Sequence, residues 1–206
     1  NKKTGLFKIE PYLKNKIKGE CISKNGDNFN GIWILSLNSE KNNIFVPHKG
    51  LWKWKNGNWF DGICKYNAFF RGKGYIKLNN GNILSGEWEN RLFDNGKLIW
   101  NNGNYFSGKF KNNKPFDGFG KCEKKNGFYF FGEFKNGILF NGNCKCISND
   151  KKFIFEGIIK NGKFSNGYQK FLKDNLIIKV NSNTENFKNE LSSLELLCNV
   201  AIENKN

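Results

Sequence analysis

Lysines that alternate with aromatic and aliphatic residues are the feature of this sequence that best fits a binding site. An apolar series recurs at related positions and consists of Trp59, Ile83, Tyr105, Tyr129 and Ile154. Five lysines follow regularly spaced glycines by one or three residues, namely Lys73, Lys97, Lys121, Lys145 and Lys170. Ammonium groups beside aromatic rings can hold phosphate, which fits anionic phospholipid and, less well, nucleic acid. The same pattern is also typical of a solvated surface whose lysine stems cover apolar side chains.

The remaining reactive residue types do not have the spacing of a catalytic or metal site. Cys144 and Cys146 form a Cys-x-Cys pair, whereas zinc sites usually contain Cys-x-x-Cys. We therefore interpret these cysteines, together with Cys122, as small buried apolar residues. His48 is the only histidine, and no Ser/His/Asp or Cys/His arrangement surrounds it in the sequence. We expect no catalytic residues, no metal and no cofactor, and hence no enzymatic activity.

The composition favours a soluble chain that binds an acidic partner. Its 206 residues carry a formal charge of +16, and all 34 basic residues except Arg71 and Arg91 are lysine. A basic surface attracts phospholipid or nucleic acid, although a codon bias that enriches lysine and asparagine explains the charge equally well. No apolar run approaches the ~20 residues of a membrane span. With six cysteines and no visible signal peptide, we expect a cytoplasmic chain with free thiols.

An internal repeat organises most of the chain. The pattern aromatic-x-Gly-x-apolar recurs as FNGIW (29–33), FDGIC (60–64), LSGEW (84–88), FSGKF (106–110), FFGEF (130–134) and FEGII (155–159). The central glycines are separated by 31, 24, 22, 24 and 25 residues. A second series, in phase with the first, consists of Phe70, Phe93, Phe116, Phe140 and Phe164. Such a fixed period is typical of repeat architectures.

Asn-Gly pairs predict that each repeat is a β-hairpin. They occur at 25–26, 56–57, 80–81, 102–103 and 126–127, where a type I′ turn with positive φ at both residues is expected. A loop of about six residues would then lead to the next hairpin. Stacked hairpins predict an all-β, single-layer antiparallel meander of about 12–14 strands. We expect a lead-in at 1–14, the sheet at 15–180 with an insertion at 36–50, and a tail at 181–206.

Alternation along the strands predicts one aromatic face. Its most prominent members are Trp33, Trp54, Trp88, Trp100, Phe110 and Phe134. The repeat glycines lie between the aromatic columns on this face, where a missing side chain leaves room for rings to lie across the sheet. A single layer would leave the aromatic stripe partly exposed, and exposed stripes usually mark interaction sites. We therefore predict that these six residues bind an extended or helical segment of another protein.

The stretch NGNILSGEWENRLFDNGKLIWNNGNYFSGKFKNNKPFDGFGK resembles the MORN repeat (membrane occupation and recognition nexus). The resemblance covers roughly residues 15–180, with Phe in place of Tyr and Gly-x-Gly kept at 72–74 and 118–120. It implies an elongated, twisted antiparallel sheet with a groove along one face. It also implies two functions, which are a scaffold in a cytoskeletal, ciliary or membrane-associated assembly and a module that binds anionic phospholipid.

The segment after the last repeat changes character. TENFKNELSSLELLCNVAIENK predicts an amphipathic helix whose apolar stripe contains Phe187, Leu191, Leu194, Leu197 and Cys198. Thr184 is suited to begin this helix as its N-cap. Because natural sheets cover their open edges, we expect the helix to cap the sheet, and docking on a partner or a second copy is the alternative.

Overall fold

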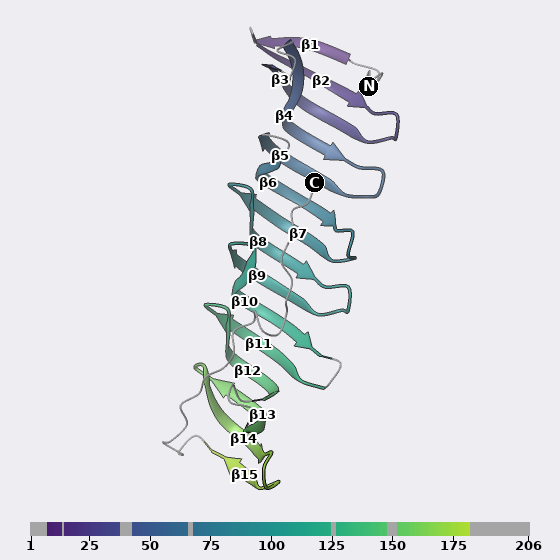
Figure 1. Cartoon of the computed structure of the whole chain (residues 1–206). Coiled ribbons are helices and arrows are strands. Elements are labelled where there is room, and N and C mark those ends of the chain that lie inside the picture. Colours follow the sequence, from purple (N-terminus) through teal and green to yellow (C-terminus); the bar gives the residue numbers. More distant parts are fainter. Residues whose placement is uncertain are drawn as a thin grey trace. The chain divides into compact units, whose positions relative to one another are not determined.

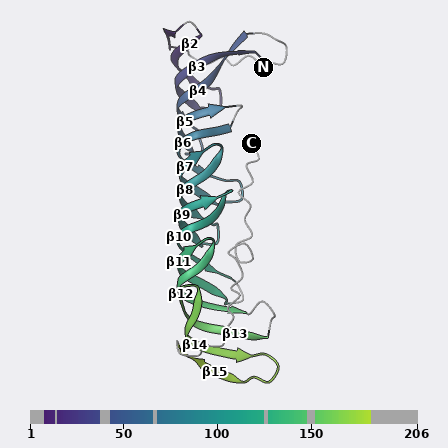
Figure 2. The same ribbon diagram turned by 90° about the vertical axis from the view of Figure 1, so that its left-hand side faces the viewer.

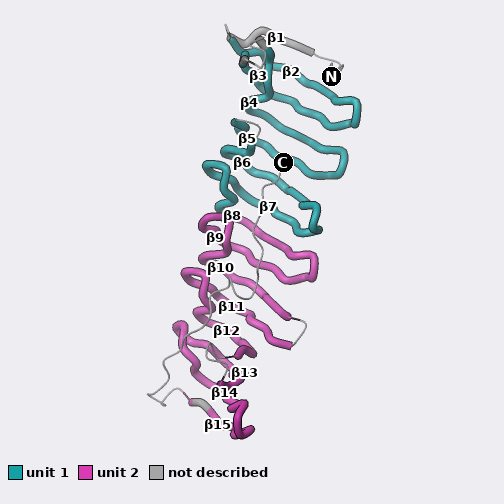
Figure 3. The backbone as a smooth tube through the Cα atoms, in the orientation of Figure 1, with its two compact units in different colours: residues 1–94, 206 teal, residues 95–205 magenta. Residues whose placement is uncertain are grey.

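The computed structural model is all-β in the residues that it describes, which are 8–13, 15–37, 43–65, 68–124, 127–147 and 152–181. The chain divides into two compact units, residues 1–94 and residues 95–205 (Figure 3). The division falls within strand β8 (Leu92–Ile99). Each unit contains antiparallel strands that pair in chain order, which confirms the antiparallel meander predicted from the repeats.

Unit 1 contains seven complete strands in one layer (Figure 1). These are β1 (Lys8–Leu13), β2 (Lys16–Ile22), β3 (Asn28–Leu37), β4 (Asn43–Lys53), β5 (Trp59–Lys65), β6 (Ala68–Lys77) and β7 (Ile83–Glu89). Strand β1 pairs with β2 and so extends the sheet into the expected lead-in at 1–14. The expected insertion at 36–50 falls where β3 and β4 form a lengthened hairpin.

Unit 2 repeats the same architecture, again as one layer of strands (Figure 2). After β8 come β9 (Tyr105–Lys111), β10 (Lys114–Glu123), β11 (Tyr129–Lys135), β12 (Ile138–Ile147), β13 (Phe153–Lys160), β14 (Lys163–Phe171) and β15 (Ile177–Val180). The predicted C-terminal helix and its stripe lie outside the described residues.

Glycines of neighbouring strands lie directly opposite one another. Gly62 faces Gly72 in unit 1, and Gly108 faces Gly118 in unit 2. A Cβ atom added to Gly62 would be 2.9 Å from Cζ of Phe60, so the phenyl ring occupies the space above the glycine. The prediction that glycine leaves room for rings is therefore confirmed at this position.

At Gly62 the backbone of β6 is also close, with the Cα of Gly72 2.7 Å from the added Cβ atom. Gly108 has an additional requirement, which is its backbone conformation. Its φ of +147° is rarely adopted by residues with a side chain. A Cβ atom there would be 2.6 Å from the Cα of Gly118 and in contact with the carbonyl oxygen of Asp117. The obstacle at Gly108 is therefore the backbone of β10 and not the phenyl rings beside it in the sequence.

Two kinds of turn recur among the described connections between strands, and neither is a six-residue loop. At Asn102-Gly103, only Gly103 has a positive φ, of 85°. The Gly103 N–H donates to the Trp100 carbonyl (3.0 Å), and the Trp100 N–H donates to the Asn104 carbonyl (2.8 Å). These bonds close a three-residue loop, so the predicted type I′ turn at this Asn-Gly pair is wrong.

The two-residue turns with positive φ at both positions lie at the other end of the hairpins. Examples are Asn112-Asn113, with φ values of 52° and 61°, and Asn136-Gly137, with values of 52° and 76°. The Gly137 N–H also donates to the carbonyl of Phe116, at 2.7 Å. The same bond joins Gly162 to Phe140 at 2.8 Å, so these turns attach each hairpin to the one before it.

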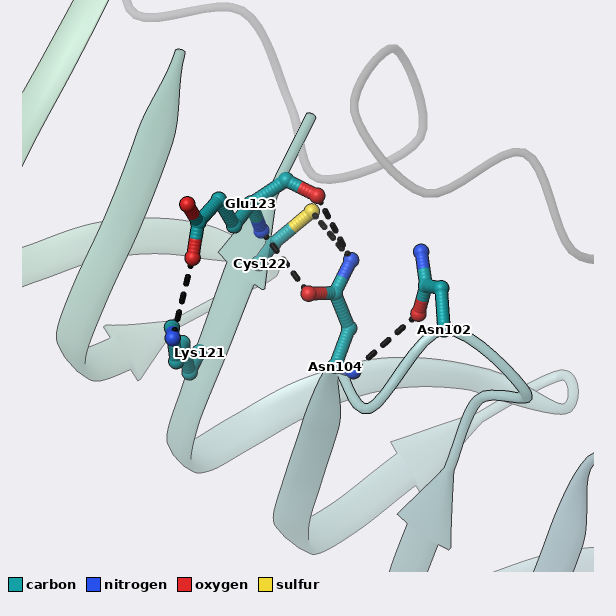
Figure 4. A network of polar contacts seen from close by, with 5 residues as sticks. All are labelled: Asn102, Asn104, Lys121, Cys122 and Glu123. Atoms are coloured by element: carbon teal, nitrogen blue, oxygen red, sulfur yellow. Dashed lines mark hydrogen bonds and ion pairs between the residues drawn. The ribbon is translucent and has the colours of Figure 1, made fainter. Parts of the chain in front are cut away.

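An asparagine side chain makes the corresponding attachment at the end with three-residue loops (Figure 4). The Asn104 carboxamide donates to the carbonyl oxygen of Glu123 (3.1 Å), and its Oδ1 accepts from the Glu123 N–H (2.9 Å). Asn102 Oδ1 accepts from the Asn104 N–H (3.0 Å) and so supports the loop. In unit 1, Asn58 binds the backbone of Lys77 through the same pair of hydrogen bonds, at 3.2 and 2.8 Å.

Candidate functional site

The aromatic face, which we call the inner face, is buried. Five of the six predicted anchor residues have between 2 % and 6 % of their surface exposed, namely Trp33, Trp88, Trp100, Phe110 and Phe134. Trp54 is half-buried. The partly exposed stripe that motivated the prediction is therefore absent at these five positions, and their role as anchors stays a prediction.

The rings of the inner face pack on one another as well as on the glycines. The Phe60 and Phe69 rings are stacked with centroids 4.2 Å apart, and the Trp88 and Phe93 rings meet edge to face at 4.8 Å. In unit 2, the Phe106 ring contacts Phe110 at 5.3 Å. Edge-to-face pairs stabilise a core beyond their buried area. This mutual packing explains how aromatic side chains become buried on a single layer of strands.

The opposite face, which we call the outer face, carries the predicted lysines. The structure brings Lys121 directly opposite Tyr105 and Lys145 directly opposite Tyr129 on neighbouring strands. Lys170 likewise lies opposite Ile154. These three lysines therefore alternate with the apolar series as the sequence predicts.

The two remaining lysines have other neighbours in the register. Lys73 lies opposite Asp61 and Glu87 and forms an ion pair with Glu87 at 2.9 Å. Lys97 lies opposite Ser107, and its Nζ is 5.4 Å from the centre of the Tyr105 ring, within reach of a cation–π contact. Lys73 and Lys97 follow their repeat glycines by one residue, whereas the other three lysines follow theirs by three. This spacing accounts for the different neighbours of the two groups.

Several of the outer-face lysines form ion pairs with glutamates. Lys121 pairs with Glu123 and Lys145 pairs with Glu156, each at 2.9 Å. The hydrogen bond with Glu156 raises the pKa of Lys145. Exposed pairs of this kind contribute little to stability, but they reduce the positive charge available to an anionic ligand.

An exposed phenylalanine pair on the outer face was not predicted from the sequence. Phe119 and Phe131 are 43 % and 40 % exposed, and their rings meet edge to face at 5.0 Å. The signal is present in the sequence, because Phe119 separates two glycines and Phe131 follows Phe130 directly. Consecutive residues of a strand point to opposite faces. Phe119 therefore lies on the face opposite to its neighbouring glycines, and Phe131 lies on the face opposite to Phe130.

The cysteines and the histidine do not form a cluster. Cys144 and Cys146 are buried with their Sγ atoms 3.9 Å apart. Their hydrogen bond, together with burial, raises the pKa of Cys144. His48 lies in β4, where burial and the charge of Lys16 lower its pKa. Within the described ranges, no three His, Cys, Asp or Glu side chains are placed to hold a metal ion together.

The described part of the chain contains no helix that is long and apolar enough to cross a membrane. No model of a known protein family matches the sequence, and no curated protein matches it either. The resemblance to MORN repeats therefore rests on the phased motifs of the sequence.

Proposed function

We propose that this chain is a non-enzymatic scaffold that binds a segment of another protein on the outer face of its sheet. The observation that carries the proposal is the Phe119–Phe131 pair, which exposes two large apolar rings side by side on a strand surface. Exposed aromatic groups are the side chains most often found at the centre of protein interfaces. The proposed site differs from the inner-face site that the sequence favours, because the inner rings are already in contact with one another.

Polar groups surround the phenylalanine pair. Glu133 lies directly opposite Phe119 on β11, while Lys121 and Asn143 lie on either side of Phe131. An apolar centre with a polar rim is the usual arrangement of a protein-binding surface. The resemblance to MORN repeats supports this proposal, since it implies a scaffold within a cytoskeletal, ciliary or membrane-associated assembly.

Binding to anionic phospholipid is the second candidate. It is favoured by Trp59, which is 39 % exposed on the outer face of unit 1 and lies opposite Lys53 and Tyr75. Tryptophan and lysine together are typical of surfaces that enter a headgroup layer. The ion pairs of Lys73, Lys121 and Lys145 argue against a strongly anion-binding face.

Two double variants distinguish these functions. Phe119→Ser with Phe131→Ser removes the apolar pair, and Lys97→Glu with Lys170→Glu reverses two exposed outer-face charges. Each variant is compared with the unaltered chain by capture of partners from native extract at low and moderate salt. Sedimentation with phosphatidylserine vesicles, and with neutral phosphatidylcholine vesicles, measures lipid binding in parallel. Circular dichroism and thermal unfolding verify that both variants keep the fold.

We expect the phenylalanine variant to lose its protein partner while it keeps its fold, with a melting temperature that is lowered by the loss of one edge-to-face contact. The charge-reversed variant should keep the partner, and binding should persist at moderate salt. If only the charge reversals abolish binding, and phosphatidylserine vesicles are bound in a salt-sensitive way, the lipid function replaces the scaffold function.

A further inference from the structure

A row of side chains crosses the strands of unit 2 on the outer face. It connects residues that lie directly opposite one another on successive strands from β9 to β14. Its members are, in order, Tyr105, Lys121, Phe131, Asn143, Ile158 and Asn166. Apolar and polar side chains alternate along this row. Because neighbouring strands are about 4.8 Å apart, an apolar side chain recurs after two strands, or about 9.6 Å.

The apolar members of the row are accessible to a partner. Phe131 is 40 % exposed, Ile158 is 43 % exposed, and Tyr105 is half-buried. The Phe119 ring, which meets Phe131 edge to face at 5.0 Å, adds a second ring beside the centre of the row. A segment that contacts all three apolar members must therefore present a side chain to the sheet every 9.6 Å or so, about twice the strand spacing.

This spacing distinguishes between the conformations that a bound segment can have. A polyproline II helix has three residues per turn and rises 3.1 Å per residue, so every third side chain returns to one side after about 9.3 Å. Seven residues of an α-helix cover about 10.5 Å, and side chains on one side of a β-strand recur after about 6.8 Å. Over the two periods from Tyr105 to Ile158, a polyproline II helix deviates from the row by about 0.6 Å and an α-helix by about 1.8 Å. Polyproline II therefore fits the row best.

The polar members of the row complement the backbone of such a segment. Lys121, Asn143 and Asn166 are exposed, and their side chains can all donate hydrogen bonds. A polyproline II helix makes no internal hydrogen bonds, so its carbonyl oxygens are free to accept them. Proline has no backbone N–H that would need an acceptor on the sheet. The row thus offers donors between its apolar contacts, where the segment offers acceptors.

Positive charge lies at one end of the row. The Nζ of Lys97 is 5.4 Å from the centre of the Tyr105 ring, and Lys121 lies directly opposite Tyr105. Lys121 pairs with Glu123, whereas Lys97 is exposed. At the other end, the neighbours of Ile158 in the row are uncharged asparagines. An acidic residue of the segment is therefore complementary to the Tyr105 end. Charges at the rim of an interface affect orientation and association rate more than affinity, so reversing Lys97 need not release the partner.

We propose that the segment bound by this face is a proline-rich polyproline II helix that lies across β9 to β14, with an acidic residue near Lys97. Every third residue of the segment is apolar and contacts Tyr105, Phe131 or Ile158. This inference rests on the proposed scaffold function and specifies the conformation and chemistry of the partner. A proline-rich segment is extended before it binds and so loses little conformational entropy, which is why such segments are recognised by aromatic surfaces.

Four fluorescent peptides serve as probes of the full chain, and their affinities are measured by fluorescence anisotropy. The first contains four repeats of Leu-Pro-Pro between terminal glutamates. The second replaces the prolines by glycine and serine and so keeps the leucine spacing without the polyproline II conformation. The third is an alanine-rich helix with leucine at every seventh position and the same terminal glutamates. The fourth is the first peptide with lysines in place of the glutamates.

Three variants of the chain locate the binding site. Phe131→Ser and Ile158→Ser each remove an apolar member of the row. Ile138→Ser is the matched control, because Ile138 is 37 % exposed but lies opposite Lys135, outside the row. Thermal unfolding verifies that the variants remain folded. The side-chain amide signals of Asn143 and Asn166, followed by NMR in the unaltered chain, report contact with the polar members.

We expect the proline peptide to bind at least about tenfold more tightly than the flexible peptide, because it is preorganised. Phe131→Ser and Ile158→Ser should each weaken its binding at least about fivefold, as for contacts at the centre of an interface, and Ile138→Ser should not. The amide signals of Asn143 and Asn166 should shift with the proline peptide. The lysine-flanked peptide should bind more weakly than the glutamate-flanked one, and tighter binding would contradict the acidic residue.

Two results would overturn the inference and leave the scaffold function standing. One is that the proline peptide does not bind, or binds no more tightly than the flexible peptide. The other is that the helical peptide binds more tightly than the proline peptide and depends on Phe131 and Ile158. The scaffold function itself fails on a different result, which is retention of the native partner by the Phe119→Ser, Phe131→Ser variant.

Discussion

Replacing Asn104 by alanine tests how neighbouring hairpins are held together. The Asn104 carboxamide makes two hydrogen bonds with the backbone of Glu123, and the residue is only 7 % exposed. Alanine removes both bonds and leaves the N–H and the carbonyl of Glu123 without these partners. Because a hydrogen bond contributes a net of about 1 kcal/mol, we expect the free energy of unfolding to fall by about 2 kcal/mol.

Two matched variants separate this effect from the general cost of losing an asparagine. Asn58 makes the same two bonds with Lys77 in unit 1, but these bonds are exposed, so water can replace the lost partner. We expect Asn58→Ala to cost less than about 1 kcal/mol. Asn102→Ala removes a single bond within the loop and leaves the pairing between Asn104 and Glu123 in place.

The assay combines urea denaturation, followed by tryptophan fluorescence, with amide hydrogen exchange measured by NMR. The Glu123 amide should exchange faster in Asn104→Ala, because its acceptor is lost, and should stay protected in Asn102→Ala. Equal losses of stability in Asn104→Ala and Asn58→Ala, or unchanged exchange of the Glu123 amide, would refute the reasoning.

Three further predictions concern single positions. Gly108→Ala should lower the melting temperature more than Gly103→Ala, because a Cβ atom at Gly108 meets the neighbouring strand and one at Gly103 meets nothing within 4 Å; equal shifts would contradict this. The His48 imidazole should titrate by NMR below its ordinary pKa of 6.5. Protonation then favours the unfolded chain, so stability should fall as the pH drops below 6.5, less steeply in His48→Gln. Burial raises the pKa of Cys64 to about 12, so iodoacetamide at pH 8 should label it in urea but not in the native chain.

The repeat made the strands and their order predictable. Glycine and aromatic residues recur with a period of two hairpin strands, and this period places Phe60, Gly62 and their counterparts on one face. The turns were harder to assign, because asparagine and glycine occur at both ends of the hairpins. Turn type depends on the number of residues between the two members of the last hydrogen-bonded pair of a hairpin. At Asn102-Gly103 this number is three. The sequence alone does not define this number.

The candidate site was less predictable than the fold. Alternation shows which face a side chain is on, but not how far its neighbours cover it. Trp88 is buried because the rings of Phe60, Phe69 and Phe93 surround it, which requires the register of several strands. By contrast, the role of Asn104 had a visible signal, since an asparagine follows the glycine of several Asn-Gly pairs. Its bonding partner lies in the next hairpin and could be identified only from the paired strands.

The bonds between turns and preceding hairpins have a direction. In the backbone bonds of the two-residue turns, the donor, Gly137 or Gly162, comes later in the chain than the acceptor, Phe116 or Phe140, by about one repeat. During synthesis the N-terminus of the chain leaves the ribosome first. Each acceptor carbonyl is therefore already available when its donor emerges. Every new hairpin can therefore be added to a finished template without waiting for distant sequence. We expect this protein to fold progressively during synthesis, with the growing edge of the sheet as the surface that chaperones would protect.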